Sequence, residues 1–241
     1  MIPVLFNCKG SSDDIAAVRK LTERSAFSLK GICIYTENGA EEITDFAKKL
    51  QIPVAFGAGE PLMMKENHTY SYGNSKRRAV DLIKDFVQAN DNAVIVSDAP
   101  LTNIAAFLLC YPHMAEKIKC IAIAGGSIYS GNSTPCAEKN IYDDPEAAQI
   151  VISSSAPVVL FPLEATRGSS NTLMTVLCCL IDATCADTVE CGVEIELESS
   201  CSRGCSIVDL FNKRNLKKIK VVTKTYVEKL NKLLESGKAG K

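Results

Sequence analysis

The sequence predicts an α/β protein built on a mostly parallel, open sheet with helices on both faces. Short apolar runs alternate along the chain with segments whose apolar residues recur every three to four positions. This alternation is typical of a parallel sheet whose strands are joined by helices. A chain of 241 residues with 46% hydrophobic content can bury a sizeable core, and we expect one domain over residues 1–241.

Each expected strand is a run too short for a typical helix, bounded by polar residues, glycine or proline. In chain order these runs are Pro3–Phe6, Ile32–Tyr35, Pro53–Phe56, Ala93–Val96, Cys120–Ile123 and Pro157–Phe161. The segments with helical spacing are Asp13–Thr22, Ala40–Leu50, Ser75–Ala89, Leu101–Leu109 and Pro145–Ser153. Asp144 fits the N-cap of the last helix, because proline follows it at the first helical position.

The charge balance favours a small partner over a polyanion. Lys and Arg number 27 against 28 Asp and Glu, so neither a nucleic-acid surface nor an anionic-membrane surface is indicated. The sequence begins without a basic segment followed by an apolar run, and no stretch approaches the roughly 20 apolar residues of a membrane span. We therefore expect a soluble, cytoplasmic protein that binds no nucleic acid and no membrane.

Eleven cysteines raise the question of disulfides or zinc. Zinc is disfavoured, because no CxxC pair occurs and neither His68 nor His113 is close in sequence to the cysteine-rich C-terminal third. In a cytoplasmic chain, thiols are kept reduced. We expect the cysteines to pack mostly as small hydrophobic residues.

Polar residues follow four of the expected strands, at the points where ligands of open parallel sheets bind. They are Asn7, Lys9, Asp13 and Asp14; then Glu37 and Asn38; then Asp98; and finally the stretch AGGSIYSGNSTPCAEKN. Turn or cap chemistry explains each one alone, but four such turns converge on one edge of the sheet. Neither a Walker phosphate loop nor a GxGxxG fingerprint occurs, which disfavours a nucleotide-phosphate site.

Several stretches match motifs of one enzyme family in the order of that family. NCKGSSDDIAAV is similar to D-x-D-P-G-x-D-D-A, and APLTNIA to G-P-L-T-N-I-A. AGGSIYSGNSTPCAEKNIYDDPEAAQIV resembles M-G-G…G-N…P-x-A-E-F-N-I…D-P-E-A-A, while IPVAFGAGEPL and SRGCSIVD resemble two further stretches. The chain thus resembles a divergent, shortened member of the inosine-uridine-preferring nucleoside hydrolase family.

This resemblance implies calcium-dependent hydrolysis of the N-glycosidic bond of a ribonucleoside to ribose and base, as in purine and pyrimidine salvage, by a homo-oligomer. It implies that Asp14 is a calcium ligand and that Asp98 lies where the family uses a main-chain carbonyl on calcium. The ribose-binding positions it implies are Asp13, Asn38, Asn132, Glu138 and Asn140.

The departures from the family pattern concern catalysis. Lys9 replaces the aspartate that the family uses as calcium ligand and general base, and Asn7 replaces another aspartate. The C-terminal His-Asp pair of the family, which supplies the leaving-group acid and the last calcium ligand, has no equivalent; Cys178-Cys179 is nearest in position. Residues 171–182 stand where the family has a longer helical insert over the base, so we expect a reduced C-terminal cap.

The change from aspartate to Lys9 adds two units of positive charge, the same charge that calcium carries. We therefore expect Lys9 to lie within ion-pair reach of Asp14 or Asp98 and to replace calcium, which is absent or weakly bound. No residue is assigned a catalytic role. Two functions stay open: a nucleoside hydrolase with weak or lost activity, and a catalytically silent paralogue that binds a nucleoside, ribose or a partner subunit.

Overall fold

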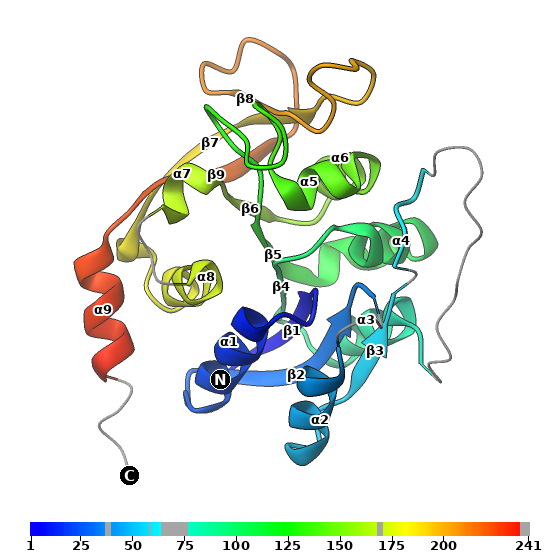
Figure 1. Cartoon of the computed structure of the whole chain (residues 1–241), viewed down its shortest axis with the longest axis vertical. Coiled ribbons are helices and arrows are strands. Elements are labelled where there is room, and N and C mark those ends of the chain that lie inside the picture. The colour runs from blue at the N-terminus through cyan, green and yellow to red at the C-terminus, as the bar shows by residue number, and fades with distance from the viewer. Residues whose placement is uncertain (37–39, 58, 64–76, 168–170, 237–241) are drawn as a thin grey trace.

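The computed structural model describes residues 1–36, 40–57, 59–63, 77–167 and 171–236 (Figure 1). Over these residues the molecule is organised around a nine-stranded sheet with the strand order β3-β2-β1-β4-β5-β6-β9-β7-β8. Neighbours from β3 to β9 pair in parallel, whereas β7 runs antiparallel to both β9 and β8. The expected fold class is confirmed.

All six expected strands form, with bounds that differ by up to a few residues. The strands are β1 (Ile2–Cys8), β2 (Phe27–Ile34), β3 (Val54–Phe56), β4 (Ala93–Ser97), β5 (Ile118–Ala124), β6 (Val158–Phe161), β7 (Ala186–Ile195), β8 (Ser206–Asp209) and β9 (Lys218–Thr225).

The five expected helices also form, although Ser75 and Lys76 at the start of the third lie outside the described residues. The helices are α1 (Ser12–Thr22), α2 (Glu41–Lys49), α3 (Ala79–Ala89), α4 (Thr102–Cys110), α5 (Lys139–Asp143), α6 (Pro145–Ser153), α7 (Leu163–Thr166), α8 (Thr172–Ile181) and α9 (Val227–Ser236), with 3₁₀ turns η1 (Pro112–Lys117) and η2 (Ala183–Cys185). Asp144 caps α6 as expected, since its side chain accepts a hydrogen bond from the Ala147 amide.

The helices cover both faces of the sheet. Helices α1, α2 and α8 pack on one face and α3, α4 and α6 on the other (Figure 1). Successive residues of a strand point to opposite faces, so Val4 and Phe6 of β1 enter one core and Leu5 enters the other. This two-sided burial explains why the expected strands read as continuous apolar runs.

The C-terminal part contains elements that the search for apolar runs did not find. Exposed polar residues interrupt both strands, so neither is a continuous apolar run: Asp187, Thr188 and Glu190 in β7, and Lys218, Lys220 and Lys224 in β9. Helix α8 falls in the segment expected to form a reduced cap. Its buried residues, including Leu173 and Leu177, pack in the core between α1 and the sheet.

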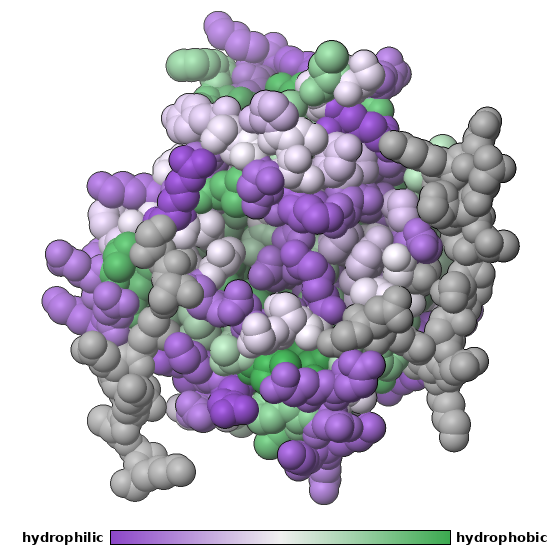
Figure 2. All heavy atoms as spheres, viewed as in Figure 1, coloured by the Kyte–Doolittle hydropathy of each residue, from purple (hydrophilic) through white to green (hydrophobic). Residues whose placement is uncertain are grey.

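The described residues contain no helix long and apolar enough to cross a bilayer. On the face seen in Figure 2, hydrophilic residues predominate and the apolar residues form small, separate areas. This face therefore presents no broad apolar surface.

Truncation of a side chain in the core of α4 should destabilise the fold. Phe107 is fully buried, so Phe107→Ala should lower the free energy of unfolding by about 3–5 kcal/mol through lost burial and a cavity. The matched control is Leu109→Ala on the same helix, where the side chain is 59% exposed and the loss should stay below about 1 kcal/mol. Urea denaturation measures both, and similar losses would contradict the packing described here.

Candidate functional site

The candidate site lies at the carboxyl ends of β1, β4 and β5, and the buried side chain of Asn7 joins the elements beneath it. Asn7 Nδ2 donates to Ser97 Oγ at 2.9 Å and to the Pro100 carbonyl at 3.4 Å. Asn7 Oδ1 accepts from Asn103 Nδ2 at 2.9 Å, and the Asn7 carbonyl accepts from the Asp98 amide. Asn7, expected beside the cleft, therefore has its amide fully used in joining β1 to β4 and α4.

Asp14 sits at the start of α1, where the sequence forms a capping box. Asp14 Oδ2 accepts hydrogen bonds from the amides of Gly10 and Ser11 at 2.9 and 2.8 Å and from Ser11 Oγ at 2.8 Å. In return, Ser11 Oγ accepts from the Asp14 amide. The other oxygen, Oδ1, is buried and has no hydrogen-bond donor among the described residues.

Asp98, Glu138 and Asn140 meet at the ends of β4 and β5. Asn140 Nδ2 donates to Asp98 Oδ1 at 3.0 Å and to the Ala124 carbonyl at 2.9 Å, whereas Asn140 Oδ1 is buried without a donor in the described part of the chain. Glu138 caps α5 and accepts from the amides of Gly126 and Asn140, each at 2.9 Å. Gly126 has φ +77°, which favours glycine and turns its amide toward Glu138.

Lys9 is half-buried and acts on the carboxylates of Asp14, Asp98 and Glu138 through its charge, without direct contact. Its charge lowers the pKa of Asp14, Asp98 and Glu138, against the larger effect of burial, which raises all three. No carboxylate of the described residues forms an ion pair with Lys9. The expected direct contact with Asp14 or Asp98 is therefore not found, and Lys9 acts on the cluster as a shared charge.

Burial raises the pKa of Asp98 to about 6, the largest carboxylate shift for which a value is resolved. Lys9 and the Asn140 hydrogen bond lower this pKa, while the charges of Asp14 and Glu138 raise it. A carboxyl group that titrates near neutrality beside two unpaired acceptor atoms is typical of a ligand site.

The donor set does not fit calcium. Calcium takes six to eight oxygen ligands, most often with several carboxylates. Here Lys9 occupies the position of a family carboxylate and Asn7 is committed to Ser97 and Asn103. Among the described residues of the site, the buried side-chain oxygens without a donor are Asp14 Oδ1 and Asn140 Oδ1. The Lys9 charge already acts on Asp14, Asp98 and Glu138, and it opposes a divalent cation at the same place.

The remaining expected site residues lie at the rim or elsewhere. Asp13 and Asn132 are exposed, and Asn132 Oδ1 accepts from the Lys139 amide at 2.8 Å. Asn38 lies outside the described residues. Asn171, just before α8, donates from Nδ2 to the Asp13 carbonyl at 3.4 Å, so the start of α8 borders the site.

Neither histidine supplies a described acid at the cleft. His113 lies on η1, which leads into the start of β5, whereas the site lies at the end of β5; His68 lies outside the described residues.

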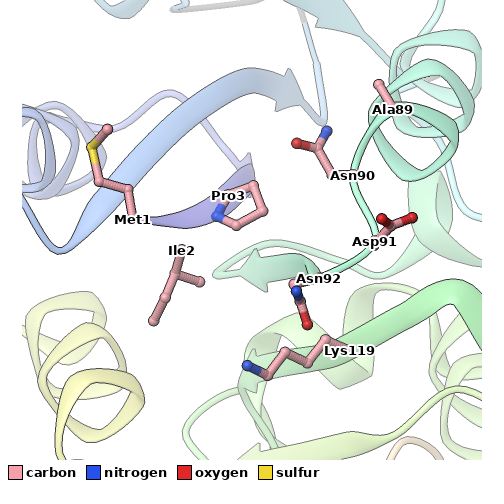
Figure 3. Close-up of a pocket in the computed structure, with 8 residues that line it drawn as sticks. All are labelled: Met1, Ile2, Pro3, Ala89, Asn90, Asp91, Asn92 and Lys119. Atoms are coloured by element: carbon pink, nitrogen blue, oxygen red, sulfur yellow. The ribbon is translucent and has the colours of Figure 1, made fainter.

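A shallow cavity of about 420 Å³ lies at the opposite edge of the sheet, at the amino ends of the strands (Figure 3). It is lined by Met1, Ile2, Pro3, Ala89, Asn90, Asp91, Asn92 and Lys119 and contains none of the expected site residues.

Two supports of the site loop were missed in the sequence. Ser206 Oγ donates to the Ser127 carbonyl and accepts from the Ser127 amide, both at 2.8 Å, which ties β8 to the loop after β5. Glu164 accepts from three consecutive amides, those of residues 128–130. Ser206 lies within the stretch SRGCSIVD, whose resemblance to the family was the available signal, whereas Glu164 carries no spacing signal.

The fold and the site together define an open α/β protein with a polar, partly anionic cluster of side chains at the carboxyl edge of its sheet. A sequence model described as "Inosine-uridine preferring nucleoside hydrolase" matches residues 4–176. The chain belongs to this family.

Curated relatives and solved structures agree with this assignment. The pyrimidine-specific ribonucleoside hydrolase RihA of Salmonella typhimurium is 33% identical over 191 residues, which cover 69% of this chain and 61% of that protein. RihA of Escherichia coli strain SMS-3-5 is 34% identical with the same coverage. The chain thus spans about 61% of the length of these relatives.

Among solved structures, the plant nucleoside hydrolase PpNRh1 superposes with a TM-score of 0.82 at 20% identity, covering 98% of each chain. A purine-preferring ribonucleoside hydrolase from Gardnerella vaginalis also gives 0.82 at 20% identity, with 98% of this chain and 97% of that one covered. At this identity the likeness establishes the shared fold.

The raised pKa of Asp98 predicts a pH-dependent penalty on folding. The folded state holds the Asp98 proton more tightly than the unfolded state does. Protonation of Asp98 therefore stabilises the folded state fully below about pH 4, and this stabilisation is lost as the pH rises through about 6. In chelator at pH 7.5, Asp98→Asn should therefore raise the free energy of unfolding by up to about 3 kcal/mol, and this gain should vanish toward pH 4.

Urea denaturation of the wild type and the variant from pH 4 to pH 8 measures the difference. The control is Asp45→Asn on exposed α2, which should show no such pH-dependent gain. A pH-independent difference for Asp98→Asn would contradict the burial of this carboxylate.

Proposed function

We propose that the cleft binds the ribose of a ribonucleoside and that hydrolysis of the N-glycosidic bond, the reaction of the family, is weak or lost. The observation that carries this proposal is the pairing of two donor-free acceptors, Asp14 Oδ1 and Asn140 Oδ1, with the nearby charge of Lys9. This arrangement suits a polyhydroxylated ligand better than it suits a metal ion.

Sugar hydroxyl groups match the hydrogen-bonding needs of the cleft. Each hydroxyl donates one hydrogen bond and accepts others, so a ribose diol can donate to Asp14 Oδ1 and Asn140 Oδ1 while it accepts from the Lys9 ammonium. A buried acceptor left unpaired costs about 1–3 kcal/mol. Pairing both with one ligand recovers that cost and gives the site its preference for a diol.

Hydrolysis requires a base or metal that activates water and an acid that protonates the departing base. The described residues of the site provide neither. An attacking water needs an activating base or metal, and Lys9 stands at the position of the carboxylate that would serve. The departing base needs a proton donor, and His113 lies at the opposite edge of the sheet. Among the described residues, bound ribose therefore meets no base or acid that would stabilise the transition state.

Lys9 replaces calcium electrostatically. Asp14, Asp98 and Glu138 cluster in a partly buried cleft, and the Lys9 charge lowers the pKa of each. An ammonium group can donate hydrogen bonds to hydroxyl groups, but it has no open coordination position for a water molecule. The site keeps its electrostatic balance without a metal and gives up metal-assisted chemistry.

A catalytically silent paralogue is the second candidate, and the committed amide of Asn7 favours it. The Asn7 side chain makes its contacts with Ser97, Pro100 and Asn103, so it has no free group for a reacting substrate. A slow hydrolase and a silent binder would share the ribose site. They would differ in whether ribose and free base are formed from the bound nucleoside. The expected homo-oligomer stays a prediction for both.

Ribose binding is tested by calorimetric titration of the chelator-treated protein with D-ribose, inosine and uridine. Saturable binding is expected for each ligand. Asp14→Asn should weaken it at least about tenfold, because the cap at Oδ2 can remain while the free acceptor becomes an amide donor. Asp45→Asn is the control and should bind as the wild type does. Absence of binding at millimolar ligand, or unchanged affinity of Asp14→Asn, would overturn the proposal.

The role of Lys9 is tested by Lys9→Asp. In chelator the variant should melt below the wild type, because four carboxylates then share the cleft without a cation. Calcium should restore its melting temperature. At one hundred times its dissociation constant, calcium should add about 2.7 kcal/mol to the free energy of unfolding. The matched control is Lys20→Asp, the same charge change at an exposed position of α1.

Release of free base from inosine and uridine should stay at or near background in Lys9→Asp with calcium, since the leaving-group acid is still missing. Tight calcium binding by the wild-type protein would contradict the replacement of calcium by Lys9. A calcium response of Lys20→Asp equal to that of Lys9→Asp would do so as well.

A further inference from the structure

A pair of free cysteines lies beside the loop that carries the ribose-binding residues. The Cys136 and Cys205 thiols share a hydrogen bond, and Cys136 Sγ also contacts the Cys201 carbonyl at 3.7 Å. Both side chains are partly exposed. A small oxidant can therefore reach them without unfolding of the protein.

The backbone holds the two cysteines at a distance that a disulfide accepts. Ala137 and Cys205 form an antiparallel bridge. Cys136 directly precedes Ala137, so its backbone lies beside that of Cys205, and the hydrogen bond between the two thiols brings their side chains together. Disulfides span Cα distances of about 4.4–6.8 Å, so no large backbone movement is needed.

The loop that would be joined is compact and holds two of the site residues. The amides of residues 132–134 donate to the Ala137 carbonyl, and the Gly131 amide donates to the Pro135 carbonyl. A Cβ on Gly131 would lie 2.2 Å from the Ala137 carbonyl oxygen, so the turn requires glycine there. Asn132 and Glu138 flank this turn, and its position affects both.

We propose that Cys136 and Cys205 form an oxidant-responsive disulfide that fastens the ribose-binding loop to the start of β8. With a peroxide as oxidant, the Cys136 thiolate attacks one peroxide oxygen, the O–O bond breaks, and a sulfenic acid and one water form. The Cys205 thiol then attacks the sulfenic sulfur, the S–O bond breaks, and a second water leaves. Two thiols lose two electrons and the peroxide gains them.

The order of attack follows from the surroundings of the two thiols. Burial raises the pKa of Cys205, and the neighbouring Cys136 raises it further. A thiol held in its protonated form reacts slowly with peroxide. Cys205 is therefore assigned the resolving role, which leaves the first attack to Cys136.

Existing hydrogen bonds would carry the effect of the new bond into the site. Ser127 Oγ donates to the Cys136 carbonyl at 3.0 Å, and Ser206, next to Cys205, is bonded twice to the Ser127 backbone. The disulfide adds a covalent link to the same three segments. Motion of residues 131–138 relative to β8 should consequently be restricted in the oxidised protein.

The test compares the fully reduced chain with the chain treated with hydrogen peroxide. Peptide mapping after alkylation should find one Cys136–Cys205 disulfide. The melting temperature should rise by about 5–10 °C, because the bond closes a loop of about 70 residues. Amide exchange over residues 131–138 should slow, and a thiol reductant should reverse all three changes.

Cys136→Ser and Cys205→Ser should each lose the rise in melting temperature, whereas Cys201→Ser, a change at an exposed cysteine of the same segment, should keep it. The proposal is overturned if mapping of the wild-type protein finds no such disulfide, if Cys136 pairs with Cys201 instead, or if oxidation leaves amide exchange over the loop unchanged. The wild-type mapping does not depend on any variant folding.

Discussion

The buried amide of Asn7 is the interaction on which the geometry of the cleft depends. Its side chain joins the end of β1 to the end of β4 and to α4, and its carbonyl receives the Asp98 amide. The loop that follows β1 leads to Lys9 and Asp14, and the loop after β4 carries Asp98. A carboxylate at position 7 lacks the amide hydrogens that Ser97 and Pro100 accept, so this part of the framework requires asparagine.

The two departures from the D-x-D motif of the family therefore act together. Asn7 removes one negative charge and joins β1 to β4 and α4, while Lys9 replaces another negative charge by a positive one. The local charge changes by three units in total, more than the charge of one calcium ion. Burial raises the pKa of Asp98 to about 6, and the Lys9 charge lowers this pKa by more than the charge of Asp14 or of Glu138 raises it.

The sequence predicted the parallel part of the fold well, because strands buried on both faces are continuous apolar runs such as VLF and AVIV. It failed for β7 and β9, where exposed polar residues interrupt the apolar runs, mostly acidic residues in β7 and lysines in β9. For the site, motif spacing placed Asp14, Asp98, Glu138 and Asn140 at one edge of the sheet. Motif spacing could not show that the Asn7 side chain lies beneath the site instead of within it. It also could not show whether Lys9 forms a direct ion pair, because both depend on side-chain direction.

The two halves of a nucleoside meet different parts of this chain. The residues that suit ribose come from β1, β4, β5 and the loops after them, all within the matched residues 4–176. Helix α8, which occupies the place of the base-covering insert, buries its apolar residues between α1 and the sheet, and only its start borders the site. Binding energy from the sugar is available in both the ground state and the transition state, and such uniform binding does not raise the rate of bond cleavage. Interactions that strengthen as the base departs would have to come from the C-terminal segment, where Cys178 and Cys179 are packed in the interior around α8. The proposed sugar site and the groups that would act on the departing base therefore depend on different parts of the chain.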